Sequence, residues 1–220
     1  TSALYNNTTG GNNTATGYAA LGFNTTGISN TANGTSALYN NTTGGNNTAT
    51  GYGALYSNTA GRENTANGYF ALYNNKGSYN TATGYYALAF NTTGNFNTAF
   101  GYSAGSSSVT GNNNTFIGYN ARGIETEFDL NNVTAIGAGA IVSISNSVRI
   151  GNGNVTIIEG QVAFSNPSDK RLKENIVVNN RLGLNFITQL QPVSYNYISD
   201  KTKIRHEGFI AQDIEKVMND

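Results

Sequence analysis

A short, regular repeat fills the first half of the chain and leaves few folds open to it. Seven copies follow one another over residues 1–17, 18–34, 35–51, 52–68, 69–84, 85–101 and 102–118, and only the fifth departs from the period, being shorter by a single position. The unit reads x-x-Ala-Leu-x-x-Asn-Thr-Thr-Gly-x-x-Asn-Thr-Ala-x-Gly. A unit this short that holds two Gly does not make a pair of helices. The period therefore predicts a β-solenoid in which each copy forms one coil.

Within each coil we expect two strands of about four residues joined by two tight turns. Asn-Thr-Ala-x-Gly and Tyr-x-Ala-Leu are the predicted strands. The Gly that ends the first strand supplies a positive φ, and the Asn/Thr/Gly cluster supplies the other turn. Ala at two fixed places indicates a thin interior that accepts only small side chains, so we expect the Leu of each coil to be buried elsewhere.

The expected stripes of Leu and Tyr set the predicted oligomeric state. One Leu and one Tyr per coil, stacked in register, need a partner surface. Closed symmetry then favours a trimeric parallel β-solenoid or β-roll shaft over a monomer. An ice-binding solenoid is the alternative, because ladders of Thr are typical of one, but Thr stands in predicted turns here as often as in strands.

Charge divides the chain sharply. Residues 1–118 contain three charged residues, Arg62, Glu63 and Lys76, whereas residues 168–220 contain eight Lys or Arg and seven Asp or Glu. The net charge is zero, which gives no reason to expect nucleic acid or an anionic membrane as a partner. The repeats also lack the pair of acidic residues that a glycosidase needs.

Further classes of site are excluded by composition. The chain has no Cys, so a disulfide framework and a thiolate metal site are excluded, and we predict no metal and no cofactor. No apolar run approaches the roughly 20 residues of a transmembrane helix, so no membrane insertion is expected for this fragment. We expect the chain to be a fragment or a processed product, since it begins inside a repeat without Met.

The period loosens over residues 119–167, where we expect irregular β-roll coils and a linker. An acidic insertion lies between Ile124 and Leu130, and the similar segments 132–137 and 146–151 follow each other at a shorter spacing. Asn-Ser-Val-x-Ile-Gly, with the intervening Ala-Ile-Gly-x-Gly-Ala, resembles the β-roll heads of trimeric autotransporter adhesins, which supports the predicted trimer. Residues 155–164 alternate as a strand or short hairpin, and Asn166-Pro167 breaks the pattern.

Residues 168–220 form a predicted small α+β domain. We expect a helix over roughly 180–190, strands at 193–197 and 208–211, and a helix from about Ala211 to the end. Three motifs, SDKRLKENI from Ser168, LQPVSYNY and HEGFIAQDIE, together resemble the C-terminal intramolecular chaperone of phage tailspikes and tail fibres, of the endosialidase type. The resemblance implies a domain that trimerises, nucleates folding of the fibre and then cuts itself off. We expect this copy to be truncated at its C-terminus.

The same resemblance implies the catalytic residues of that cut. Ser168 is the nucleophile, Lys173 is the base, and the bond between Pro167 and Ser168 is cleaved. The supporting members of the matching motifs are Asp169, Arg171, Asn175 and Gln212. His206, the sole histidine, is left outside this set because a His between Arg205 and Glu207 is typical of a surface.

The residues by themselves leave the dyad open. A Lys amine serves as a base only when neutral, which requires its pKa to fall from about 10.4 to about 7–8, or roughly 4 kcal/mol. A spacing of five places the two side chains about 17 Å apart in a strand and about 140° apart around a helix, so only a bent segment unites them. Ser168 as the N-cap of a helix, with Lys173 in solvent, is the alternative.

Taken together, the sequence predicts a trimeric tail-fibre-like structural protein with a C-terminal intramolecular chaperone. Enzyme activity is limited to a hypothesis, one self-cleavage per chain by a Ser-Lys serine endopeptidase. The predicted partners are two further copies of the chain and a glycan or protein receptor on a host cell. The predicted location is the tail fibre of a virion or an extracellular phage-like particle. The alternative is a bacterial surface adhesin or another secreted protein that binds cell surfaces.

Overall fold

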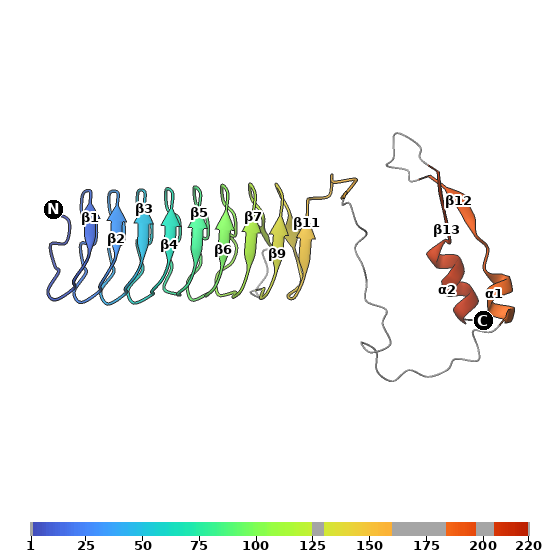
Figure 1. Ribbon diagram of the computed structural model, residues 1–220, viewed down its shortest axis with the longest axis horizontal. Helices are drawn as coiled ribbons and strands as arrows, with labels where there is room; N and C mark the ends of the chain where they lie inside the picture. The colour runs from blue at the N-terminus through green and yellow to red at the C-terminus, as the bar shows by residue number, and fades with distance from the viewer. Residues whose placement is uncertain (1, 125–129, 160–183, 197–204, 220) are drawn as a thin grey trace. The chain divides into compact units, whose positions relative to one another are not determined.

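The computed structural model describes residues 2–124, 130–159, 184–196 and 205–219, which are organised in two compact units, Thr1–Asn154 and Val155–Asp220. The first unit is a parallel β-solenoid, in which each repeat closes one coil and adds one strand (Figure 1). Its main sheet consists of the strands β1 (Thr14–Thr16), β2 (Thr31–Asn33), β3 (Thr48–Thr50), β4 (Thr65–Asn67), β5 (Thr81–Thr83), β6 (Thr98–Phe100), β7 (Thr115–Ile117), β9 (Thr134–Ile136) and β11 (Val148–Ile150). The predicted mainly β fold is confirmed.

The Thr-Ala-x segment forms each strand because its side chains alternate between solvent and interior. Neighbouring strands pair in parallel with the same residues opposed, for example Thr31 with Thr48 and Ala32 with Ala49. Thr points outward from the sheet, where its branched side chain suits a strand, and Ala points into the coil. The following Gly then turns the chain, and Gly51, with a φ of 121°, has the positive angle that the sequence predicted.

The second predicted strand, Tyr-x-Ala-Leu, is a turn in every repeat, as far as the structure describes it. Its second and fourth residues have left-handed backbone angles, as at Phe70 and Leu72, with φ of 54° and 52°. A Leu with left-handed backbone angles costs about 1–2 kcal/mol, so the local preference of Leu argues against this conformation. The conformation is repeated because the N–H of each Leu donates to the next coil, as from Leu55 to the carbonyl oxygen of Ala71 at 3.0 Å.

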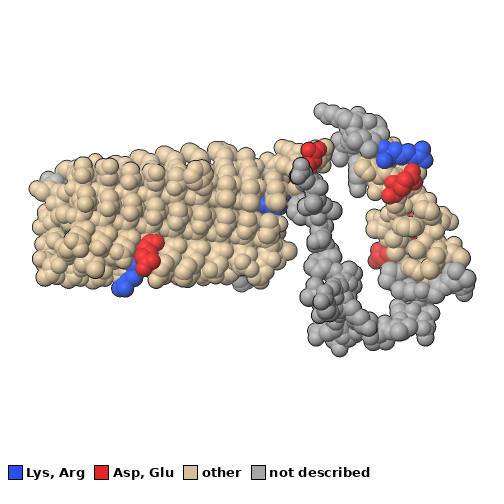
Figure 2. Space-filling view, in the orientation of Figure 1, with Lys and Arg blue, Asp and Glu red and all other residues tan. Residues whose placement is uncertain are grey.

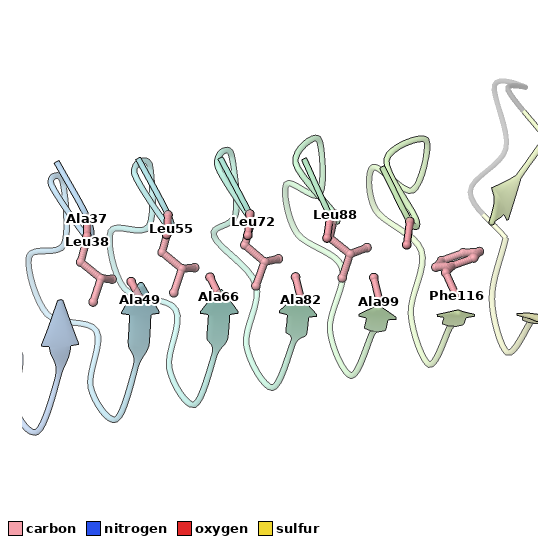
Figure 3. Close-up of a cluster of buried hydrophobic side chains, with 14 of the residues drawn as sticks. Ala37, Leu38, Ala49, Leu55, Ala66, Leu72, Ala82, Leu88, Ala99 and Phe116 are labelled. Carbon is pink, nitrogen blue, oxygen red and sulfur yellow. The ribbon is translucent and has the colours of Figure 1, made fainter. Parts of the chain in front are cut away.

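These left-handed angles also turn the Leu side chains into the coil. Leu21, Leu38, Leu55, Leu72 and Leu88 are completely buried within a single chain. Figure 3 shows Leu55 and Leu72 pointing toward the row of strand alanines that includes Ala66. The two Ala positions are buried as expected, but the expectation that Leu lies outside the coil is wrong. Leu therefore gives no argument for a trimer.

One coil exchanges large and small residues. Gly105 stands where the other repeats have Leu, and Phe116 stands where they have the strand Ala. The Phe116 ring is buried and fills the space above Gly105, since a Cβ on that glycine would lie 2.7 Å from the ring. The exchange preserves the filling of the interior, as close packing requires.

Two columns of buried Asn run along the solenoid and tie each coil to the next. One consists of Asn24, Asn41, Asn58, Asn75 and Asn91, and the other of Asn30, Asn47, Asn64, Asn80, Asn97 and Asn114. In the first column Asn41 Nδ2 donates to Asn24 Oδ1 at 2.7 Å and to the carbonyl oxygen of Gly44 at 3.0 Å. The Asn of the repeat is thus an internal hydrogen-bonding residue as well as a turn former.

The coils lose their uniform length toward the end of the unit. Thr115 pairs with Thr134, which makes that coil longer than the repeat, and Thr134 pairs with Val148, which makes the next coil shorter. In these coils the side that is a turn in the earlier repeats forms a second, two-stranded parallel sheet from β8 (Arg122–Gly123) and β10 (Ile141–Val142). The acidic residues of the predicted insertion, 125, 127 and 129, lie outside the described residues. Residues 155–159 have no regular structure.

The described residues of the second unit form two helices and a β-hairpin. Helix α1 (Leu184–Gln189) precedes β12 (Val193–Tyr195), which pairs antiparallel with β13 (His206–Gly208), and α2 (Ala211–Asn219) follows. The first helix, first strand and last helix agree with the sequence prediction. The second strand was predicted at 208–211 but ends at Gly208, so Phe209 and Ile210 form the connection to α2.

Candidate functional site

The motif predicted to cut the chain does not fall in the described part of the structure. Pro167, Ser168, Asp169, Arg171, Lys173 and Asn175 lie outside the described residues. Gln212 is described, and it lies exposed in the first turn of α2. The Ser-Lys dyad and its cleavage site therefore stay predictions.

A cluster of polar side chains crosses the hairpin of the second unit. Ser194 Oγ lies 2.6 and 2.7 Å from the two carboxylate oxygens of Glu207, and Arg205 Nη2 donates to Ser194 Oγ at 2.8 Å. Arg205 Nε also pairs with Glu207 at 3.2 Å. The three side chains are exposed, so the cluster is a surface interaction that stabilises the hairpin weakly.

His206 lies on the same hairpin, where its side chain packs against a residue of the neighbouring strand. Its ring stacks on that of its cross-strand partner Tyr195, with centroids 5.6 Å apart, and the residue is half-buried. The ring therefore takes part in packing of the hairpin.

The helices of the second unit border a cavity of about 510 Å³. Leu190, Phe209, Ile210, Ile214 and Val217 supply its apolar side chains. Phe209 and Ile210 are exposed, so this unit has apolar surface that is uncovered in a single chain.

The outer face of the main sheet changes character along the solenoid. Its outward positions hold Thr or Asn from β1 to β5 and become apolar toward β11. The apolar members are Phe100, Ile117, Ile136, Val148 and Ile150, which are 37–69 % exposed. No outward position of the nine strands holds a charged residue, and Figure 2 shows a solenoid surface nearly free of charge.

Tyrosines beside this face form a ladder on the outside of the solenoid. Tyr52, Tyr69, Tyr85, Tyr102 and Tyr119 stack in sequence, with ring centroids 5.0–5.5 Å apart and planes within 21° of parallel. Each inner ring has both faces covered by its neighbours, so the ladder presents ring edges and hydroxyls to solvent. The predicted Tyr stripe is thus real.

A second aromatic stack contains Tyr39, Tyr56 and Tyr73. Burial raises the pKa of the Tyr56 phenol above its ordinary value, and the neighbouring phenols Tyr73, Tyr39 and Tyr52 raise it further. The cause is that a phenolate is disfavoured both by lost water and by other phenolates nearby.

The described residues offer no other recognised centre. They hold no cluster of three or more His, Asp or Glu suited to a metal ion. Nor does any helix among them have the length and apolarity that a membrane span requires.

Comparison with known families assigns the C-terminal segment. Residues 168–220 match the family described as chaperone of endosialidase. No curated protein and no solved structure matches the chain at a significant level.

Proposed function

We propose, from a C-terminal segment of the chaperone-of-endosialidase family joined to a β-solenoid, that this chain is a trimeric tail-fibre-like structural protein. The solenoid is the shaft, and residues 168–220 act as an intramolecular chaperone that brings three chains together and starts their folding. The family of this domain implies a trimeric assembly. Attachment to a cell surface, as part of a phage tail, is the role that fits such a shaft.

The proposal that the shaft itself is trimeric rests on the outer face of the sheet. An exposed row of Phe100, Ile117, Ile136 and Ile150 is costly for a monomer in water, at about 25 cal/mol per Å² of apolar surface. Because the face carries no charge, copies can meet there without desolvating ions. Three copies around one axis would cover it on every chain.

Sedimentation and light scattering on the full chain test this proposal. For the uncleaved Ser168→Ala variant we expect a mass three times the chain mass of 23.2 kDa across micromolar concentrations. The pair Ile117→Lys and Ile136→Lys should weaken the trimer, because it places charges in the interface. Ile28→Lys is the matched control, since Ile28 is exposed but lies outside the sheet. A monomeric wild type, or equal loss in the control, would refute the trimeric shaft.

Self-cleavage before Ser168 is the enzymatic part of the proposal. Ser168 Oγ attacks the carbonyl carbon of Pro167 and passes its proton to the neutral amine of Lys173. The C–N bond breaks as the amine of Ser168 takes up a proton, which leaves an ester between Pro167 and Ser168 Oγ. Water hydrolyses the ester, giving a carboxylate at Pro167 and restoring the hydroxyl.

Denaturing gels of the assembled protein test the cut. Wild type should give two fragments with a junction between Pro167 and Ser168, while Ser168→Ala and Lys173→Ala should stay intact and still assemble. An intact wild type after assembly removes the peptidase and leaves the chaperone role untouched.

A further inference from the structure

A shallow groove runs along the solenoid, outside the main sheet. Its volume is about 530 Å³. It is lined by Phe23, Asn40, Thr42, Ser57, Thr59, Asn74, Lys76 and Thr92. These residues directly precede or follow the buried Asn of their coil, so the inward Asn column separates two outward ridges. With coils about 4.8 Å apart, the groove from Phe23 to Thr92 spans about 19 Å.

The groove offers polar groups that the protein itself does not use. The side-chain amides of Asn40 and Asn74 and the hydroxyl of Ser57 make no hydrogen bond to the described part of the chain. Each amide has two donors and an acceptor, and a hydroxyl has one of each kind. Groups of this kind, spaced along an extended groove, suit a ligand with many hydroxyls.

The Thr ridge is held in place by the backbone. Thr42 Oγ1 donates to the carbonyl oxygen of Thr59 at 3.0 Å, and Thr92 Oγ1 donates to that of Val109 at 3.0 Å. Their donors are used, so these hydroxyls face the groove as ordered acceptors. Phe23 adds an aromatic ring at one end, and it lies nearly perpendicular to Tyr39, outside the parallel stack.

Charge narrows the class of ligand. Lys76 is one of three charged residues in the seven repeats, and it replaces the Thr that five of the other six repeats have at this place. It is exposed and forms no ion pair with the described residues. A single cation in an otherwise neutral groove favours a ligand with anionic groups.

We propose that this groove binds an extended acidic oligosaccharide, with Lys76 paired to one acidic group and Asn40, Ser57 and Asn74 bonded to sugar hydroxyls. The site extends the attachment role proposed above. It lies within one chain, so a monomeric protein that still binds would refute the trimer and leave the groove standing.

Calorimetric titration of the full chain with hexagalacturonate, cellohexaose and hexaglutamate separates the ligand classes. We expect hexagalacturonate to bind more tightly than the neutral sugar, and hexaglutamate, which has the charge without the hydroxyls, to bind more weakly. Lys76→Thr, which restores the repeat residue, should weaken hexagalacturonate about two- to fivefold and leave cellohexaose unchanged. Asn74→Ala should weaken both sugars.

Arg62→Ser is the control, because it removes another cation of the repeats from a place outside the groove lining and should leave affinity unchanged. Each of four results would overturn the proposal. The first is that hexagalacturonate does not bind at millimolar concentration. The second and third are that the neutral sugar binds as tightly as hexagalacturonate, or that hexaglutamate binds as tightly or more tightly. The fourth is that Arg62→Ser loses as much affinity as Lys76→Thr.

Discussion

Replacing one buried Asn of the solenoid tests how its coils are joined. Asn58 Nδ2 is the donor to Asn41 Oδ1, at 2.9 Å, and both residues are fully buried. Asn58→Ala leaves that oxygen without a partner. The carbonyl oxygen of Gly61, the other acceptor of Asn58, keeps a second donor in Asn47 at 2.8 Å. Asn58 Oδ1 also accepts from Asn75 Nδ2 at 3.5 Å, but that donor keeps the carbonyl oxygen of Gly77 at 2.8 Å. The variant therefore creates one unpaired buried acceptor.

Asn91→Ala is a matched control in the same column. Asn91 donates to Asn75 Oδ1 and to the carbonyl oxygen of Gly94, and both acceptors keep a second bond from Asn80. Asn91 Oδ1 itself has no partner among the described residues, because the next repeat has Ser108 in this column. The control thus creates no unpaired acceptor and removes one.

The difference between the two variants isolates the unpaired oxygen. Both lose the same side chain from a buried site, so the loss of packing largely cancels. A buried acceptor without a partner costs about 1–3 kcal/mol, so Asn58→Ala should be less stable than Asn91→Ala by that amount. At a denaturant dependence of about 2 kcal/mol per molar, the urea midpoints should differ by about 0.5–1.5 M.

Equilibrium urea unfolding of the full-length variants, followed by circular dichroism and tyrosine fluorescence, measures these midpoints. Coincident curves from the two probes validate the comparison. Equal midpoints, or a lower midpoint for Asn91→Ala, would show that the Asn column does not stabilise the shaft through its hydrogen bonds.

Three further predictions concern the core and the tyrosines. Leu55→Ala should lower the free energy of unfolding by about 2–5 kcal/mol in the same assay, because Leu55 is fully buried. Gly105→Leu should destabilise the chain through its clash with the Phe116 ring, and adding Phe116→Ala should restore part of the loss, giving a favourable coupling in a double-mutant cycle. The raised pKa of Tyr56 means that the folded state holds its phenolic proton more tightly, so this stability is present below about pH 10 and is lost as pH rises through the raised pKa. Stability measured against pH should therefore fall less in Tyr56→Phe than in wild type, and an unchanged alkaline slope would contradict the reasoning.

The repeat period was the strongest source of correct prediction. A constant spacing with Gly at fixed places requires each unit to return the chain to the same point, which yields coils in parallel register. The Thr-Ala-x strand was predictable for the same reason, since alternation between a branched outward residue and a small inward one suits a single-sided sheet.

The opposite side of the coil could not be predicted from local preference. Leu is an unfavourable residue for a left-handed angle, and Leu72 adopts one because hydrogen bonds between coils and burial outweigh the strain. The wrong position for Leu had another cause, because the recurrent Ala indicated an interior too thin to hold it. Because Leu is buried inside the coil, the argument for a trimer rests on the exposed apolar residues of the outer face, such as Ile117 and Ile136.

The two candidate sites, the groove at Lys76 and the pair Ser168 and Lys173, also depend on geometry that local sequence does not give. The groove at Lys76 needs coil geometry, because its lining residues lie a whole repeat apart in the sequence. A break in the repeat was the available signal, as Lys76 falls in the one short copy. Ser168 and Lys173 depend on how their own segment bends, and their assignment stays a prediction.

The near-identity of the coils has a consequence for how chains align side by side. Residues 35–51 repeat residues 1–17 letter for letter, so a neighbouring copy shifted by whole coils meets almost the same surface. The repeats alone therefore do not fix the lengthwise alignment of neighbouring chains, which must be set by another part of the chain. Apart from the short fifth copy, the largest departures are the exchange of Gly105 and Phe116 and the apolar strands that follow it, and these come late in the solenoid, before residues 168–220. Alignment fixed at that end would propagate coil by coil along the shaft, which gives a C-terminal chaperone a definite physical task.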